Sequence, residues 1–192
     1  MRWPDTALVR AADEACRTSV SPVTVGHSWR TAAFGLALAQ VDGLRIDVEH
    51  LLAASLLHDV TLERPTPGRC FAVVGALHAL EVAQRAGADE AAARAIADAV
   101  CIHVTPGIDP SRHPLGAMVS AGAALDLLGM RLCELAPAFV AAVGTRHPRL
   151  RASRALATLW RAEGRAVPAG RAAFLDRVAL FSLVMRMAPF GD

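Results

Sequence analysis

Apolar and polar positions along this 192-residue chain recur mainly with the period of an amphipathic helix. His27, Arg30 and Phe34, for example, stand at positions i, i+3 and i+7, which is the spacing of one helical face. No segment shows sustained alternation with β-branched enrichment, and alanine and leucine dominate instead. The pattern predicts helices over residues 5–18, 24–41, 47–59, 69–86, 89–103, 114–129, 131–143, 149–164 and 169–188.

Residues that favour turns and helix ends separate these segments. Asp47 is a good N-cap for the helix that ends at His58 and Asp59, and Gly87 and Gly129 follow helices as C-terminal caps do. Pro137 either starts or kinks the helical region 131–143. No linker, low-complexity segment or internal repeat interrupts the chain. We therefore predict an all-α fold, with seven to nine helices in one domain spanning residues 1–192.

Composition narrows the class of protein. A hydrophobic content of 54% with 20% charged residues excludes disorder. No apolar run reaches the roughly 18 residues of a membrane span, and the N-terminus lacks the apolar core of a signal peptide. The net charge is +2 without a basic cluster, which argues against nucleic-acid binding. We expect a cytoplasmic protein with neither a membrane nor a nucleic-acid partner; a homo-oligomer is left open.

Missing residue types limit the chemistry further. The chain has no lysine, tyrosine or asparagine, which excludes Schiff-base catalysis by lysine and a tyrosine general base. Its four cysteines are scattered through apolar patterns and are interpreted as buried thiols, not as a disulfide framework. Catalysis must therefore rely on histidine, acidic, hydroxyl, thiol or arginine side chains.

Several titratable residues interrupt the apolar helical faces. The pair His58-Asp59 follows an apolar run at a helix end, where neighbouring side chains can reach one point. Asp126 lies in an even more apolar context, and a buried carboxylate is costly unless it is paired or bound to a metal. Imidazole and carboxylate together suit a divalent cation. The residues that stand out in this way are His27, His58, Asp59, His78, His103 and Asp126.

The order of these residues resembles the H…HD…D signature of the HD-domain metal-dependent hydrolase superfamily. His27 supplies the first histidine, His58-Asp59 the HD pair and Asp126 the distant aspartate. Four flanking segments are similar to the cyanamide-hydratase-like branch of that superfamily: residues 26–30, 71–76, 103–107 and 125–129. The likeness covers roughly residues 20–150, so the helices of residues 149–188 would pack on an HD-type core.

The resemblance implies a site and its cofactor. One divalent metal ion, zinc or iron, would be held by His27, His58, Asp59 and Asp126. His103 would bind substrate or transfer a proton, and Arg30 would orient Asp59 or a polar group of the substrate. His78 lies two helical turns beyond Phe71 and could also point inward, as a further ligand.

Four departures from the branch bear on its chemistry. Gly26 replaces the usual asparagine, and Thr61 replaces a frequent glycine. Ala72 replaces a glutamate, so cyanamide itself is a doubtful substrate. Phe71 occupies a position where two-metal HD proteins often carry a histidine, which favours a single metal.

Four functions remain open at this point. The first is a hydrolase or hydratase that activates water for attack on a small, weakly charged nitrile- or amide-like substrate. The second is a nucleotide phosphohydrolase, for which Arg30, Arg64 and Arg69 are the visible phosphate contacts. The third is a di-iron oxygenase that uses His78 and His103. The fourth is a non-catalytic binding domain. We favour the first, because the ligand-bearing helices are lined with Ala, Leu, Val and Phe.

Overall fold

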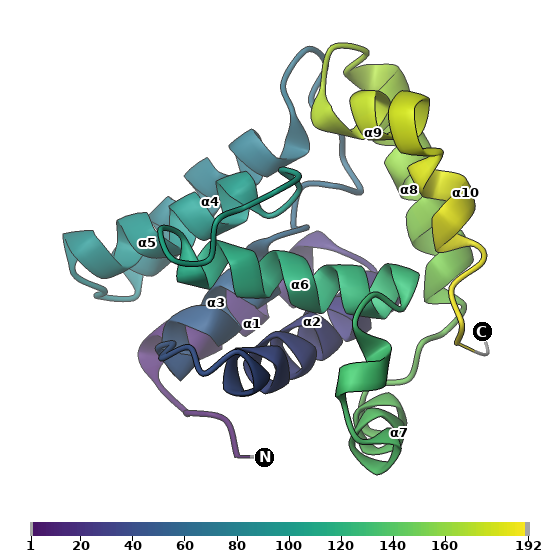
Figure 1. Cartoon of the computed structure of the whole chain (residues 1–192). Coiled ribbons are helices and arrows are strands. Elements are labelled where there is room, and N and C mark those ends of the chain that lie inside the picture. Colours follow the sequence, from purple (N-terminus) through teal and green to yellow (C-terminus); the bar gives the residue numbers. More distant parts are fainter. Residues whose placement is uncertain (1, 191–192) are drawn as a thin grey trace.

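The computed structural model describes residues 2–190 and confirms the all-α prediction (Figure 1). The described chain contains ten α-helices and one 3-10 turn, with no strand. None of these helices has the length and apolar character needed to cross a membrane. The elements are α1 (Ala7–Ser19), α2 (Pro22–Val41), α3 (Val48–Leu57), α4 (Phe71–Arg85), α5 (Glu90–Ile102), α6 (Pro114–Leu128), η1 (Leu132–Glu134), α7 (Pro137–Arg146), α8 (Ala152–Ala166), α9 (Arg171–Ala179) and α10 (Phe181–Met185).

The centre of the fold is the close pairing of α2 with α6 (Figure 1). Two glycines make it possible. A Cβ added to Gly122 of α6 would lie 2.2 Å from the Thr31 carbonyl oxygen, and one added to Gly35 of α2 would lie 2.6 Å from the Met118 carbonyl oxygen. The two backbones are therefore nearly in contact. This places His27, near the start of α2, close to Asp126, near the end of α6.

The last three helices form a separate layer along one side of the molecule, the light-green to yellow segment in Figure 1. α8, α9 and α10 pack on one another, and α8 also contacts α2. Trp160 and Leu156 of α8 belong to a hydrophobic cluster distinct from the main core. Glu163 of α8 accepts a hydrogen bond from the backbone N–H of Phe71, at 2.9 Å, and so fastens this layer to the start of α4.

Three sequence predictions need correction. The segment 169–188 is two helices, because Leu180 adopts a left-handed conformation with φ of 48° between α9 and α10. The region 131–143 is the 3-10 turn η1 followed by α7, which Pro137 starts. The pattern predicts four buried cysteines, but only Cys16 is buried; Cys70 and Cys101 are partly exposed and Cys133 is exposed. Each of the four is a free thiol.

Candidate metal centre

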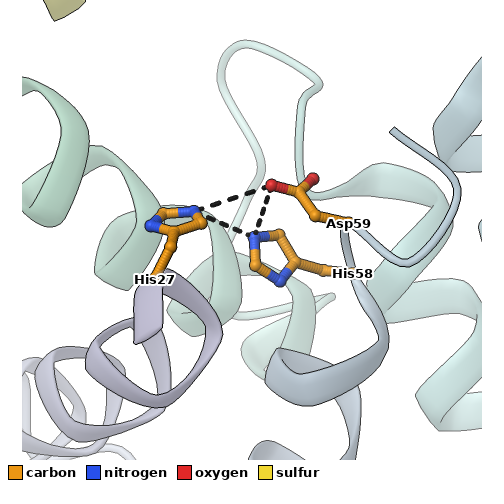
Figure 2. A group of neighbouring side chains, drawn as sticks. All are labelled: His27, His58 and Asp59. Carbon is orange, nitrogen blue, oxygen red and sulfur yellow. Dashed lines mark hydrogen bonds and ion pairs between the residues drawn. The ribbon is translucent and has the colours of Figure 1, made fainter. Parts of the chain in front are cut away.

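His27, His58 and Asp59 form a compact, buried group at the end of α3 (Figure 2). His58 ends α3 and Asp59 lies in the turn that follows, so the two neighbours are not constrained to diverge as they would inside a helix. The Nε2 atoms of His27 and His58 are 3.2 Å apart. Asp59 Oδ2 lies 3.4 Å from His58 Nε2 and 3.7 Å from His27 Nε2. Three potential ligand atoms thus face one point.

The other ring nitrogen of each histidine, Nδ1, already donates a hydrogen bond. His58 Nδ1 donates to the Ser55 carbonyl oxygen at 2.7 Å, and His27 Nδ1 donates to Asp126 Oδ2 at the same distance. A neutral imidazole carries only one ring proton, so each Nε2 then presents a lone pair. Burial lowers the pKa of His58 to about 3, which keeps that ring neutral. The group therefore consists of acceptors that face one another.

Such an arrangement fits a divalent cation. Ligands about 2.1 Å from a tetrahedral ion lie roughly 3.4 Å from each other, and the three separations here range from 3.2 to 3.7 Å. Without a cation, two imidazole lone pairs and a carboxylate would repel one another inside the core. His27, His58 and Asp59 are thus suitable in number, chemistry and spacing to hold a metal ion.

His103 completes the polar group from the far side of Asp59. It ends α5, is buried, and its Nε2 lies 3.6 Å from Asp59 Oδ1. Its Nδ1 donates to the Val100 carbonyl oxygen at 2.6 Å, so its Nε2 is also an acceptor when the ring is neutral. Burial opposes the ionisation of Asp59, but His58, His103 and His27 together hold its pKa below the usual range, and it remains a carboxylate.

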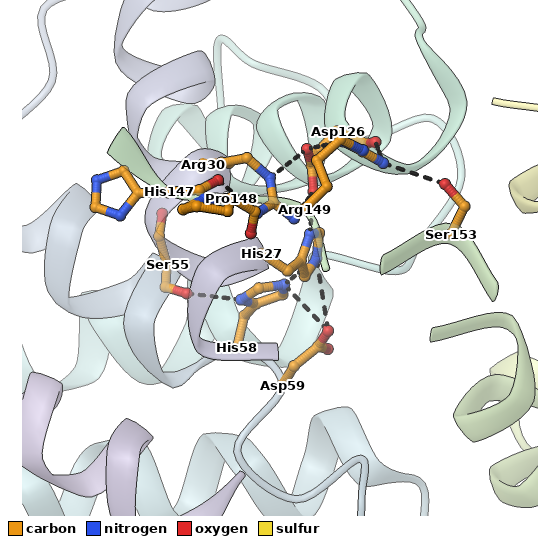
Figure 3. A network of polar contacts seen from close by, with 10 residues as sticks. All are labelled: His27, Arg30, Ser55, His58, Asp59, Asp126, His147, Pro148, Arg149 and Ser153. Atoms are coloured by element: carbon orange, nitrogen blue, oxygen red, sulfur yellow. Dashed lines mark hydrogen bonds and ion pairs between the residues drawn. The ribbon is translucent and has the colours of Figure 1, made fainter. Parts of the chain in front are cut away.

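Asp126 lies on the outer side of His27, surrounded by arginines (Figure 3). Arg30 contacts both carboxylate oxygens, from Nε at 2.8 Å and from Nη2 at 3.0 Å, and Arg149 Nη1 contacts Oδ1 at 2.6 Å. Burial opposes the ionisation of Asp126, but the hydrogen bond from His27 and the charge of Arg30 keep its pKa below the usual range. The carboxylate fixes the orientation of the His27 ring.

Gly26 is explained by this network. Arg30 Nη1 also donates to the carbonyl oxygens of His147 and Pro148, each at 3.0 Å. A Cβ at position 26 would lie 3.0 Å from that same Nη1 and 3.2 Å from the Pro148 oxygen. The absence of a side chain therefore leaves room for the guanidinium and for the loop that precedes α8.

The structure places some predicted residues differently from expectation. Arg30, for which the sequence predicts contact with Asp59 or with a polar group of the substrate, binds Asp126 and not Asp59. Asp126, the fourth ligand predicted from the sequence, lies outside the three-residue group and faces the other ring nitrogen of His27. His78 is outside the group as well, and its buried Nε2 has no hydrogen-bond partner. Arg149 was missed, because an arginine in a Pro/Arg-rich loop carries no signal of burial.

The structure shows the surroundings of the other three departures. The Thr61 hydroxyl donates to the Phe71 carbonyl oxygen at 2.8 Å and so holds the turn after the HD pair against the start of α4. Phe71 packs edge-on against His103, with ring centroids 5.6 Å apart. Ala72 is fully buried and packs in the second hydrophobic cluster.

A cavity of about 640 Å³ opens beside the metal-ligand group. His27, His58, Asp59 and His103 line one part of it. The remaining wall is mostly apolar and comes from α6, the loop after α5, and α8 to α10. Arg131 is the one arginine among the described residues that line it, and Asp42 and Glu134 already bind its guanidinium, with closest distances of 2.6 Å.

Comparison with known proteins agrees with this geometry. A search of curated proteins found no match to the chain. The family model described as "HD domain" matches residues 24–125, which is more than half of the 192 residues and includes His27, His58 and Asp59. The match does not distinguish a branch within the family. The chain belongs to the HD domain family.

Proposed function

We propose that this protein is a metal-dependent hydrolase or hydratase that adds water to an uncharged, nitrile- or amide-like carbon of a small molecule. His27, His58 and Asp59 would hold one divalent ion, zinc or iron. A metal bound there would lower the pKa of water and polarise the substrate. The cavity beside these residues gives a small molecule direct access to the group.

The choice of an uncharged substrate rests on one observation: none of the described residues that line the cavity is an available arginine. Arg131 is held by two carboxylates, while Arg30 is directed to Asp126 and does not line the cavity. Arg64 and Arg69, the other phosphate contacts predicted from the sequence, do not line it either. A phosphate ester would have only the metal ion as a charged partner there and would gain no arginine contact for its remaining charge.

His103 is the best-placed residue to move a proton. It lines the cavity, and its Nδ1–H is fixed by the Val100 carbonyl oxygen, so Nε2 is the available acceptor. From there it can take a proton from attacking water and pass it to the substrate nitrogen, which leaves from an amide and is retained in a nitrile. Asp59 supports this role, because a carboxylate 3.6 Å from Nε2 stabilises the imidazolium that forms.

Phosphohydrolysis is the main competing function, since it is the most familiar activity of the superfamily. The screen that separates the two uses zinc- and iron-loaded protein, with small nitriles and amides in one arm and nucleoside mono- and triphosphates in the other. We expect turnover in the first arm that is lost in His103→Ala and retained in His113→Ala, a variant of an exposed histidine. Phosphate release from nucleotides, with no turnover of nitriles or amides, would overturn the proposal.

Metal analysis addresses the remaining alternatives. A di-iron oxygenase would contain two iron ions per chain and consume oxygen, whereas we expect one ion and no oxygen uptake. A binding domain without catalysis would show no turnover with any metal across both arms of the screen.

A further inference from the structure

The cavity is much larger than the reacting group needs. Its volume of about 640 Å³ lies in the middle of the range of small-molecule sites, roughly 300–1,000 Å³. A nitrile or amide carbon placed against His58 and Asp59 would occupy only the polar end. Most of the space would then remain beside α8, α9 and α10, where the rest of a larger substrate would lie.

The C-terminal helices supply the wall of this second part. Trp160 of α8 and Phe181 of α10 lie against each other, with ring centroids 4.7 Å apart, and both line the cavity. Leu175 of α9 and Val184 of α10 extend the wall. All four lie beyond residue 125, where the HD family match ends. The family segment thus supplies the polar end and part of the apolar wall, and this chain's own C-terminal helices supply the aromatic part of that wall.

Charged groups of these helices are directed elsewhere. Arg161 donates to Ser182 Oγ at 3.0 Å, Arg171 donates to the Cys101 carbonyl oxygen, and Arg177 donates to the Pro168 carbonyl oxygen at 2.9 Å. None of the three lines the cavity. An ionised substituent on the substrate would lie against this wall without a partner, which is unfavourable.

We infer that the substrate carries an uncharged apolar body, of the size of one or two rings or a medium alkyl chain, which binds between Trp160, Phe181 and Val184. The inference rests on the proposed function for the position of the reacting group. The apolar body supplies binding energy away from the reacting carbon, and the C-terminal helices select for it. Each methylene that becomes buried improves binding about fourfold.

The first test measures binding without catalysis. The metal-free full-length protein is titrated with the uncharged fluorophore N-phenyl-1-naphthylamine. Val184 and Leu183 are exposed to a similar extent on α10, at 42% and 49%, but only Val184 lines the cavity. Val184→Glu therefore places a carboxylate in the wall, and Leu183→Glu places the same group one residue away, outside the cavity lining. We expect wild type and Leu183→Glu to bind within a factor of two of each other, and Val184→Glu to bind at least tenfold more weakly.

A second variant controls for the case in which Val184→Glu fails to fold. Ala179→Trp adds bulk at an exposed cavity-lining position of α9 and should also weaken binding of the fluorophore by at least tenfold, with an unchanged circular dichroism spectrum. Equal binding by wild type, Val184→Glu and Ala179→Trp would overturn the inference, as would failure of the wild-type protein to bind the fluorophore.

The second test separates this inference from the proposed function. A series of unbranched aliphatic nitriles and amides is compared on the metal-loaded wild type. We expect kcat/KM to rise about fourfold per methylene until the cavity is filled, and the rise to be lost in Ala179→Trp. Turnover that is independent of chain length would contradict the apolar body and leave the reaction intact. Fluorophore binding without any turnover would contradict the reaction and leave the apolar site intact.

Discussion

Different forces hold the side chains in place at the two ends of the cavity. At the polar end each histidine ring is oriented by a hydrogen bond from Nδ1, and Asp126 is fixed by His27, Arg30 and Arg149. At the apolar end Trp160 and Phe181 contact each other, with no directional bond. Hydrogen bonds fix the positions of the reacting groups closely, whereas apolar contacts discriminate between substrates by their shape and apolar area. We infer that reaction and substrate choice are divided between the two ends.

The largest effect should come from the polar end. His58→Ala removes one of the three converging ligand atoms, and we expect activity to fall below detection while the helical circular dichroism signal is retained. The fold depends on many buried Leu, Ala and Val side chains, so one histidine is not essential to it. The exposed His113→Ala should retain full activity. A largely unfolded His58→Ala protein would indicate instead that this histidine is structural.

The charged network behind the polar end should contribute most to stability. Arg30→Met leaves the fully buried Asp126 with one guanidinium fewer, and we expect the free energy of unfolding to fall by about 3 kcal/mol. Arg94→Met is the matched control, because its pairing with Glu90 is exposed, and it should change stability by about 0.5 kcal/mol or less. Urea unfolding curves compare the two. Similar small losses in both variants would show that Asp126 does not need Arg30.

The same network should make the metal-free protein sensitive to acid. The native pKa of His58 is about 3 against 6.5 in the unfolded chain, and the pKa values of Asp59 and Asp126 are also lowered. Between pH 6.5 and 3 the unfolded state therefore binds more protons at His58, and the two aspartates add to this below about pH 4. Stability that is present above pH 6.5 is lost as the pH falls.

The expected slope is up to about 1.4 kcal/mol per pH unit for each such group. Urea unfolding of the metal-free protein at several pH values between 7.5 and 4 measures it. His58→Ala should flatten the part of the curve above pH 4, and His113→Ala should not. A free energy of unfolding that rises as the pH falls from 6.5 would contradict the assignment of a neutral, buried His58.

The smallest effect is expected at the apolar end. Leu180 lies between α9 and α10 with φ of 48°, a conformation that costs residues other than glycine about 1 kcal/mol. Leu180→Gly should leave stability unchanged or raise it by up to about 1 kcal/mol, since the side chain is mostly exposed. Leu183→Gly, inside α10, should lower stability by about 1 kcal/mol. Equal losses in both would mean that the left-handed turn is not strained.

Much of the fold could be predicted from periodicity. Helical spacing and glycine caps identify most helices, but they miss the break at Leu180, because no glycine or proline marks it. The convergence of His27 with His58 and Asp59 was expected only from motif order. The spacing of single residues does not show that α2 and α6 pack closely enough to bring Asp126 onto His27.

The apolar end could not be predicted at all. Trp160 and Phe181 are 21 positions apart on different helices, and each alone is typical of an ordinary core residue. Their shared cavity depends on the packing of α8 against α10, which involves the turn at Leu180 between α9 and α10 and is not encoded in local sequence. Arg149 could not be predicted for a similar reason, since it lies in the loop before α8 while its partner Asp126 lies on α6.

Zinc binding to the metal-free protein, measured by isothermal titration calorimetry, tests the central claim most directly. Wild type should bind one ion per chain. Asp59→Asn should lose affinity at least a hundredfold because a ligand oxygen is lost, whereas Asp126→Asn should lose about ten- to a hundredfold because it acts through His27. The exposed Asp98→Asn should bind as wild type does. A wild-type chain that binds no zinc, or an Asp59→Asn variant that binds it equally well, would contradict the account.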